Sequence, residues 1–156
     1  MRTILLFLAI LALILSSLSN GSDTSKVMKV SDIRQLARLA SESRKIIMLE
    51  FASHSCSYCQ LLENEIINPM IISKDYPRVL IRKAMIDGYS KVLGFDGKSI
   101  NGSQLARQYN VTVTPTLLFL NAQNEEVSER IIGVNSLDFF GGYVDKAIET
   151  GLQKIH

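Results

Sequence analysis

The sequence has few of the residues that build metal centres or disulfide scaffolds. It contains two cysteines, Cys56 and Cys59, two histidines, His54 and His156, and no tryptophan. Two cysteines allow one intramolecular disulfide, so the chain is not a disulfide-rich scaffold. A structural zinc ion takes four protein ligands, and here the second histidine is the last residue. We therefore expect no metal and no cofactor.

A strong charge of one sign is also absent. The chain has 17 basic and 15 acidic residues, a net charge of +2, and no basic run. Surfaces for nucleic acids or anionic lipids need clustered basic residues. The sequence therefore gives no indication of nucleic acid binding.

The first residues are typical of a secretory signal peptide. Arg2 precedes an unbroken apolar run, Ile4 to Leu15, and small and polar residues follow before Asn20. We assign 1–19 to a signal peptide, 20–29 to a flexible segment and 30–156 to one domain. A membrane-spanning helix needs about 20 apolar residues, so an uncleaved membrane anchor is the weaker alternative. We expect an exported, periplasmic protein.

The remaining chain has the size of one domain with a real core. Ser31 and Asp32 can cap the start of a helix. The last predicted helix contains the pair Gly141-Gly142, which indicates either close packing of this helix against a neighbour or a weak helix. The patterns predict helices at 33–40, 56–69, 103–109 and 136–152, and Pro69 should kink or end the second of them. Strands are predicted at 45–51 and 79–86, followed by a long glycine-rich loop at 87–102. Two further strands are predicted within 114–133, joined by a turn near 122–124. This order indicates an α/β fold with a mixed sheet.

The cysteine pair allows three interpretations: a staple, half of a metal site, or a reversible redox pair. A disulfide closing so short a loop stabilises a fold by only about 2 kcal/mol, which makes an inert staple unconvincing. Cys56 at the first turn of a helix meets unpaired backbone N–H groups, which stabilise the reactive thiolate. Cys59, one turn later, lies within disulfide reach. We therefore favour the redox pair, with Cys56 attacking and Cys59 resolving.

Three features together resemble the thioredoxin superfamily from about Val30 to the end of the chain. They are "CSYC" after an apolar strand, Thr114-Pro115-Thr116 at the start of the next strand, and Gly133 after the following one. The resemblance implies a thioredoxin fold, a central mixed sheet flanked by helices, with Pro115 as a cis-proline opposite the cysteines. The stretch 96–127 resembles the SoxW-type periplasmic thioredoxins more narrowly.

The sequence also departs from the usual thioredoxin pattern. Ser55 stands where the family has tryptophan, and Ser57-Tyr58 replaces Gly-Pro. A tyrosine before the second cysteine resembles disulfide isomerases and glutaredoxins, which leaves the direction of electron flow open. A disulfide isomerase or oxidase is therefore one alternative, and a redox-inert binding module with a thioredoxin fold is another.

The resemblance implies an exported thiol:disulfide oxidoreductase that reduces disulfides in partner proteins. Ser57, Tyr58, Thr114 and Pro115 would contact the substrate, with the Thr114 backbone pairing to it as an added strand. Tyr58 could instead pack under the active-site helix. We expect a monomer that acts on sulfur-oxidation carrier proteins or apocytochrome c and is reduced by a membrane thiol relay.

Two further expectations concern residues around the cysteines. Glu50 interrupts the apolar strand six residues before Cys56. This pattern resembles thioredoxins, which have a buried acid at the corresponding strand position. The resemblance implies that Glu50 is the base that accepts the Cys59 proton. A strand-edge carboxylate facing solvent is the alternative. His54 could favour the Cys56 thiolate when protonated, but the sequence gives it no partner, so a solvated loop histidine is the favoured interpretation. The loop 87–102 either borders the substrate face or is a tolerated insertion.

Overall fold

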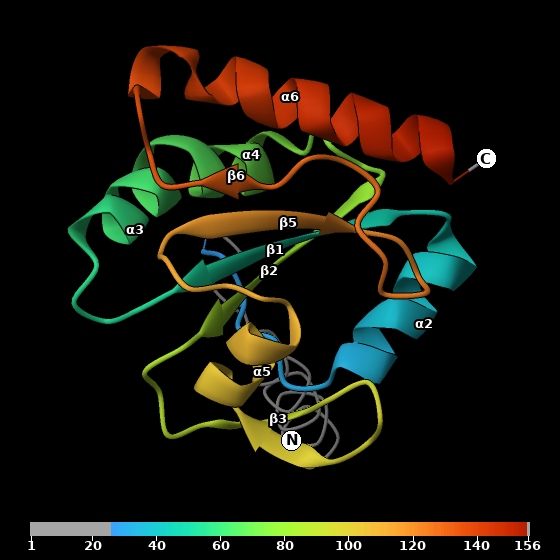
Figure 1. Ribbon diagram of the computed structural model, residues 1–156. Helices are drawn as coiled ribbons and strands as arrows, with labels where there is room; N and C mark the ends of the chain where they lie inside the picture. Colours follow the sequence, from blue (N-terminus) through green and yellow to red (C-terminus); the bar gives the residue numbers. More distant parts are fainter. Residues whose placement is uncertain (1–25, 156) are drawn as a thin grey trace, which may run out of the picture.

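The computed structural model describes residues 26–155 and shows a mixed sheet covered by helices on both faces (Figure 1). The predicted signal peptide, 1–19, lies outside the described residues. The four-stranded sheet has the order β2-β1-β5-β6, in which β1 is parallel to β2 and antiparallel to β5, and β6 is antiparallel to β5. The strands are β1 Ile46–Ala52, β2 Val79–Met85, β5 Thr116–Leu120 and β6 Ile131–Ile132. The expected α/β thioredoxin-type architecture is confirmed.

The central strand β1 divides the interior into two cores. All seven of its residues are buried, because a strand with a neighbour on each side and helices on both faces has no solvent face. Helices α2 (Ile33–Ser43) and α5 (Gly102–Gln108) cover one face, and α3 (Ser57–Leu62), α4 (Asn68–Ser73) and α6 (Leu137–Lys154) cover the other (Figure 1). Asp32 caps α2 by accepting the N–H groups of Arg34 and Gln35.

The active-site helix does not end at Pro69, contrary to one of the predicted outcomes. It passes from α3 into a π-helical turn, Glu63–Ile67, and continues as α4 to Ser73. In this turn the Asn68 N–H donates to the Glu63 carbonyl, five residues back. Proline lacks an N–H and collides with the preceding turn of an α-helix, so the wider turn lets the helical run pass through Pro69.

Residues 87–102 are not the long loop that the sequence predicts. They contain an antiparallel hairpin, β3 (Lys91–Leu93) and β4 (Ser99–Asn101). Val92 and Ile100 face each other across it and belong to the core under α2 and α5. The hairpin is therefore part of the packed domain, and the interpretation as a tolerated surface insertion is wrong.

The C-terminal part follows the prediction, with a shorter second strand. A turn at Asn121–Asn124, with Asn124 in the left-handed region, follows β5. Glu126 then forms an isolated antiparallel bridge with Leu120, and the regular strand β6 contains only Ile131 and Ile132. Helix α6 buries Phe140, Val144, Ala147, Ile148 and Gly151. A Cβ added at Gly141 or Gly142 would meet nothing within 4 Å, so close packing does not explain these glycines.

The described part of the segment expected to be flexible, 20–29, lies against β2. Val27 is buried, the Lys83 N–H donates to the Met28 carbonyl, and the Val30 N–H donates to the Lys83 carbonyl. Residues 27–30 thereby cover the outer edge of the sheet, so the packed chain begins before Val30.

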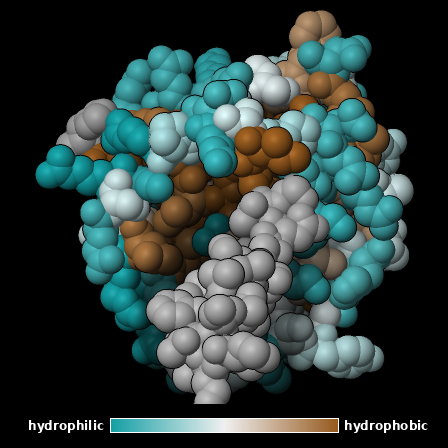
Figure 2. Space-filling model, turned by 180° about the vertical axis from the view of Figure 1, so that it is seen from behind, coloured by the Kyte–Doolittle hydropathy of each residue, from teal (hydrophilic) through white to brown (hydrophobic). Residues whose placement is uncertain are grey.

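Within residues 26–155, no helix has the length and hydrophobicity to cross a bilayer. Figure 2 shows a patch of hydrophobic side chains on this face, with hydrophilic side chains along its upper and left borders.

Candidate active site

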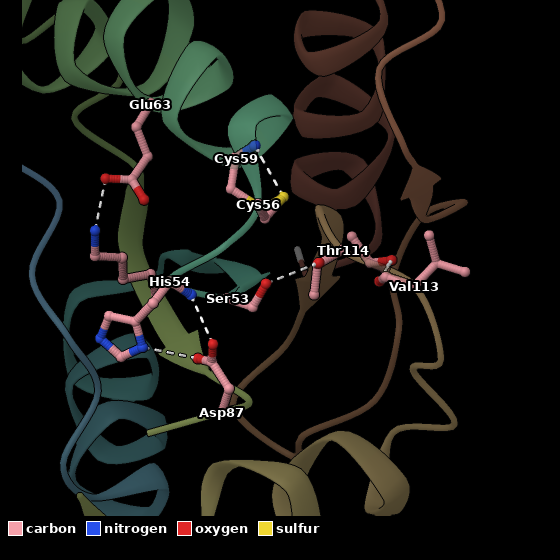
Figure 3. The surroundings of a disulfide bond; sticks show 10 residues. Ser53, His54, Cys56, Cys59, Glu63, Asp87, Val113 and Thr114 are labelled. Carbon is pink, nitrogen blue, oxygen red and sulfur yellow. Dashed lines mark hydrogen bonds and ion pairs between the residues drawn. A yellow bond between two sulfur atoms is a disulfide. The ribbon is translucent and has the colours of Figure 1, made fainter. Parts of the chain in front are cut away.

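Cys56 and Cys59 form a disulfide at the start of α3. Their Cα atoms are 5.3 Å apart, and the Cys59 N–H donates to the Cys56 Sγ at 3.1 Å (Figure 3). Cys56 is the N-cap residue, so its sulfur occupies the place where a capping oxygen usually accepts backbone N–H groups. Cys59 is 1 % exposed, whereas Cys56 is half-buried. Solvent and partners therefore reach Cys56 more readily than Cys59.

The second element of the site is the turn before β5. The Thr114–Pro115 peptide bond is cis, as the resemblance implies. The Thr114 and Ser53 hydroxyls lie 3.5 Å apart, which brings this turn beside the loop leading to the cysteines (Figure 3). Val113 is half exposed, and the Thr114 backbone makes no backbone hydrogen bond with another described residue. The Thr114 N–H and carbonyl are therefore free to pair with an extended chain, whereas the Val113 carbonyl accepts the Thr116 hydroxyl.

The two residues between the cysteines lie on the surface. Ser57 is exposed, and Tyr58 is 59 % exposed. A side chain this exposed adds little to the packing of the helix. The structure therefore favours a surface contact for Tyr58 over a packing role.

His54 has a partner that the sequence did not reveal. Its backbone N–H donates to Asp87 Oδ2 at 2.8 Å, and its Nδ1 lies 2.9 Å from Asp87 Oδ1. Desolvation is the largest single influence on the pKa of Asp87 and raises it, but the hydrogen bonds from His54 and the other smaller influences together hold that pKa below its ordinary value. The imidazole points toward Asp87 and away from the disulfide (Figure 3). The pair ties the loop before Cys56 to the end of β2.

Glu50 is buried, and the alternative of a solvent-facing carboxylate is wrong. Its exposed fraction is 0 %, and neither carboxylate oxygen has a hydrogen-bond partner among the described residues. Its pKa is raised from 4.5 to about 8: burial is the largest cause, the negative charge of Glu63 also raises the pKa, and the positive charge of Lys83 lowers it. A carboxyl group with this pKa is a stronger base than an ordinary glutamate.

Cys59 and Glu50 lie on the same side of the sheet. Along β1, Ile46 and Met48 enter the core under α3 and α6, and strand alternation places Glu50 on that face too. On α3, Cys59 shares its buried face with Leu62, which belongs to the same core. The predicted base and the resolving cysteine therefore both face this core.

An ion pair that the sequence analysis missed lies in the same region. Lys83 Nζ is 2.6 Å from Glu63 Oε2, and the two side chains are only 17 % and 16 % exposed (Figure 3). A lysine inside the apolar strand 79–86 was a signal that it needs a buried partner. Within residues 26–155, no group of three or more His, Cys, Asp or Glu is placed to hold a metal ion.

Comparison with known proteins agrees with this geometry. Residues 34–148 match the family model described as a thioredoxin-like domain. Solved structures of similar fold include a thioredoxin from Thermus thermophilus, at 24 % identity and a TM-score of 0.58, covering 80 % of this chain and 89 % of that one. Thioredoxin O2 from Arabidopsis thaliana in the oxidized state has 19 % identity and a TM-score of 0.55, covering 80 % and 96 %. No curated protein has significant sequence similarity to the chain.

Together these features define what the site can do. A half-buried sulfur at a helix start and a buried sulfur one turn later already form a disulfide. The arrangement is consistent with a thiol–disulfide oxidoreductase.

Proposed function

The chain belongs to the thioredoxin-like domain family, and on that premise we propose that it is an exported reductase of disulfides in partner proteins. The observation that carries the proposal is the Cys56–Cys59 disulfide at the start of α3, close to the cis Thr114–Pro115 bond. The half-buried sulfur is the one that a partner reaches, and the buried sulfur is the one that resolves.

The reaction begins with the reduced protein. The Cys56 thiolate attacks one sulfur of the partner disulfide, which forms a mixed disulfide and releases the first partner thiolate. Backbone N–H groups at the start of α3 stabilise this thiolate, as the bond from the Cys59 N–H to the Cys56 sulfur indicates. The Thr114 backbone pairs with the partner chain and holds its cysteine against Cys56.

Resolution requires the buried cysteine. Cys59 loses its proton to Glu50, and its thiolate then attacks the Cys56 sulfur of the mixed disulfide. The bond between Cys56 and the partner breaks, the second partner thiolate leaves, and the Cys56–Cys59 disulfide forms. Two electrons pass from the dithiol to the partner, and a membrane thiol relay restores the reduced protein.

Catalysed reduction of insulin by dithiothreitol tests this activity. We expect the wild type to accelerate insulin precipitation and the Cys56→Ser variant to leave it at the uncatalysed rate. A redox-inert binding module would give the uncatalysed rate for both proteins. Measuring the reduction potential of the pair against glutathione decides the direction of electron flow, because an oxidase or isomerase has a much less reducing potential.

The partners are identified through the mixed disulfide. The Cys59→Ser variant cannot resolve it, so native extract should yield covalent complexes that dithiothreitol releases. We propose sulfur-oxidation carrier proteins or apocytochrome c as the trapped partners. The Cys56→Ser variant is the matched control and should trap far less.

Export to the periplasm, as in the SoxW-type thioredoxins, is part of the same proposal. The leader in 1–19 supports it, because an apolar run this short with small residues after it is typical of a cleaved signal peptide. Cell fractionation and N-terminal sequencing test it. A protein that begins at Asn20 in the periplasmic fraction is the expected result, and a full-length protein in the membrane fraction would indicate the uncleaved anchor.

A further inference from the structure

Lys83 faces two carboxylates and is bonded to one of them. Glu50 and Lys83 lie directly opposite each other in the parallel register of β1 and β2. The Lys83 ammonium nevertheless lies 2.6 Å from Glu63 on the active-site helix, and both Glu50 oxygens lack a hydrogen-bond partner among the described residues. Lys83, the cation opposite Glu50 in the sheet, is therefore ion-paired with Glu63 and not with Glu50.

The surroundings of Glu50 supply few other charges. From β2 the facing charged group is Lys83, and from the helix it is Glu63. Cys59 is buried on the same face, and Tyr76 packs at its margin with its hydroxyl donating to Asp145 of α6. Strand β5 presents Leu117 opposite Glu50, and α6 buries apolar side chains on this face. Two carboxylates thus share one ammonium, and a buried carboxylate without a partner favours its neutral form.

We propose that Glu63 is a positioning residue that holds the Lys83 ammonium away from Glu50 and so keeps Glu50 basic enough to take the Cys59 proton. The inference rests on the proposed reductase function. A glutamate paired with lysine would be ionised well below neutral pH and would be a poor acceptor for a thiol proton. With Lys83 held by Glu63, Glu50 keeps its proton in the oxidised state and donates it to Cys59 when the disulfide is reduced.

The pH dependence of the resolution step tests this role. Cys56 is loaded as a mixed disulfide with thionitrobenzoate, and attack by Cys59 releases the coloured thiolate in a single turnover. In the Glu63→Gln variant Lys83 is free to pair with Glu50, so we expect the midpoint of the pH–rate profile to fall by about one pH unit or more. The Lys83→Met variant should move the midpoint in the opposite direction.

Glu65→Gln is the matched control, because Glu65 lies two residues further along the same π-helical turn and is exposed. It should keep the wild-type midpoint. An unchanged midpoint in both Glu63→Gln and Lys83→Met would overturn the proposal. Midpoints that move in opposite directions are not expected from a merely structural role of the ion pair.

A second measurement separates this inference from the proposed function. Infrared titration of the oxidised protein reports the Glu50 carboxyl directly, as the band that Glu50→Gln removes, and needs no activity. A Glu50 titration midpoint that falls in Glu63→Gln, and falls much less when Lys83→Met is also present, supports the positioning role even if the wild type does not reduce insulin, in which case the reductase function fails alone. A midpoint equal to that of the wild type overturns the positioning role.

Discussion

Cys56 accepts a hydrogen bond from the backbone N–H of the cysteine with which it is paired. The Cys59 N–H lies 3.1 Å from the Cys56 sulfur, and that sulfur caps the active-site helix. In the reduced protein we expect the N–H groups at the start of α3 to favour a thiolate at Cys56. Cys59 is 1 % exposed, and burial in apolar surroundings disfavours its thiolate.

We therefore predict that Cys56 is the thiol with the lower pKa. Iodoacetamide added to the reduced protein near pH 6 should modify Cys56 well before Cys59, as mass spectrometry of the digested protein can measure. The Cys56→Ser variant should react slowly at the same pH, and the Cys59→Ser variant should keep the fast reaction. Preferential modification of Cys59 would reverse the assigned roles.

The second prediction concerns Glu50 in the resolution step. General-base assistance is typically worth about 10²–10⁴-fold, and Glu50 is the buried carboxyl on the same face of the sheet as Cys59. Glu50→Gln should therefore slow release of thionitrobenzoate from the Cys56 mixed disulfide, while its formation keeps nearly the wild-type rate. Stopped-flow absorbance separates the two steps.

Two results decide the role of Glu50. Resolution at the wild-type rate between pH 6 and 9 would exclude it as the base. If formation and resolution slowed equally, the substitution would have disturbed the site as a whole, and the specific role would also be wrong.

The third prediction concerns stability. The pKa of Glu50 is about 8 in the folded protein and near 4.5 when exposed, so between these values the folded state holds a proton that the unfolded state has lost. Stability therefore falls as pH rises through this window. Glu50→Gln removes the dependence, and above pH 8 it should be more stable than the wild type by roughly 3–5 kcal/mol.

Urea unfolding of the oxidised protein at pH 5, 7 and 9 measures this difference. The advantage of Glu50→Gln should be small at pH 5 and largest at pH 9. Glu65→Gln, which changes an exposed carboxylate, should follow the wild type. A constant difference at all three pH values would show that Glu50 does not titrate in this window.

Much of the fold could be predicted because short, contiguous stretches of the sequence indicate it. A strand of apolar residues interrupted by Glu50, with the cysteine pair immediately after it, is a contiguous signal. The same holds for Thr114-Pro115 before the apolar strand β5. Each of these features can be recognised from a few neighbouring residues, and the structure has each of them at the residues predicted.

The parts that escaped prediction depend on contacts between distant residues. The hairpin β3–β4 has strands of three residues, too short for a periodic pattern, and its two buried side chains, Val92 and Ile100, lie in a segment rich in glycine and polar residues. The pairing of Lys83 with Glu63 joins residues 20 positions apart on a strand and a helix. Sequence spacing alone does not reveal which of two nearby carboxylates the lysine selects.

The last prediction concerns two glycines whose surroundings are opposite. A Cβ at Gly102, the first residue of α5, would lie 1.8 Å from the backbone carbonyl oxygen of Met85 at the end of β2. A backbone atom cannot move aside as a side chain can, so Gly102→Ala must displace α5 from the sheet. We expect a loss of about 3 kcal/mol or more, at the upper end of overpacking costs.

Gly142→Ala is the matched control. It makes the same substitution inside α6, where the new methyl group meets nothing within 4 Å, so it should stabilise the helix by about 1 kcal/mol. Urea unfolding followed by circular dichroism measures both variants. Because only residues 109–113 connect α5 to the cis Thr114–Pro115 turn, Gly102→Ala should also lower insulin reduction per folded molecule, whereas Gly142→Ala should not. Equal stability of the two variants would show that α5 does not pack against Met85 this closely.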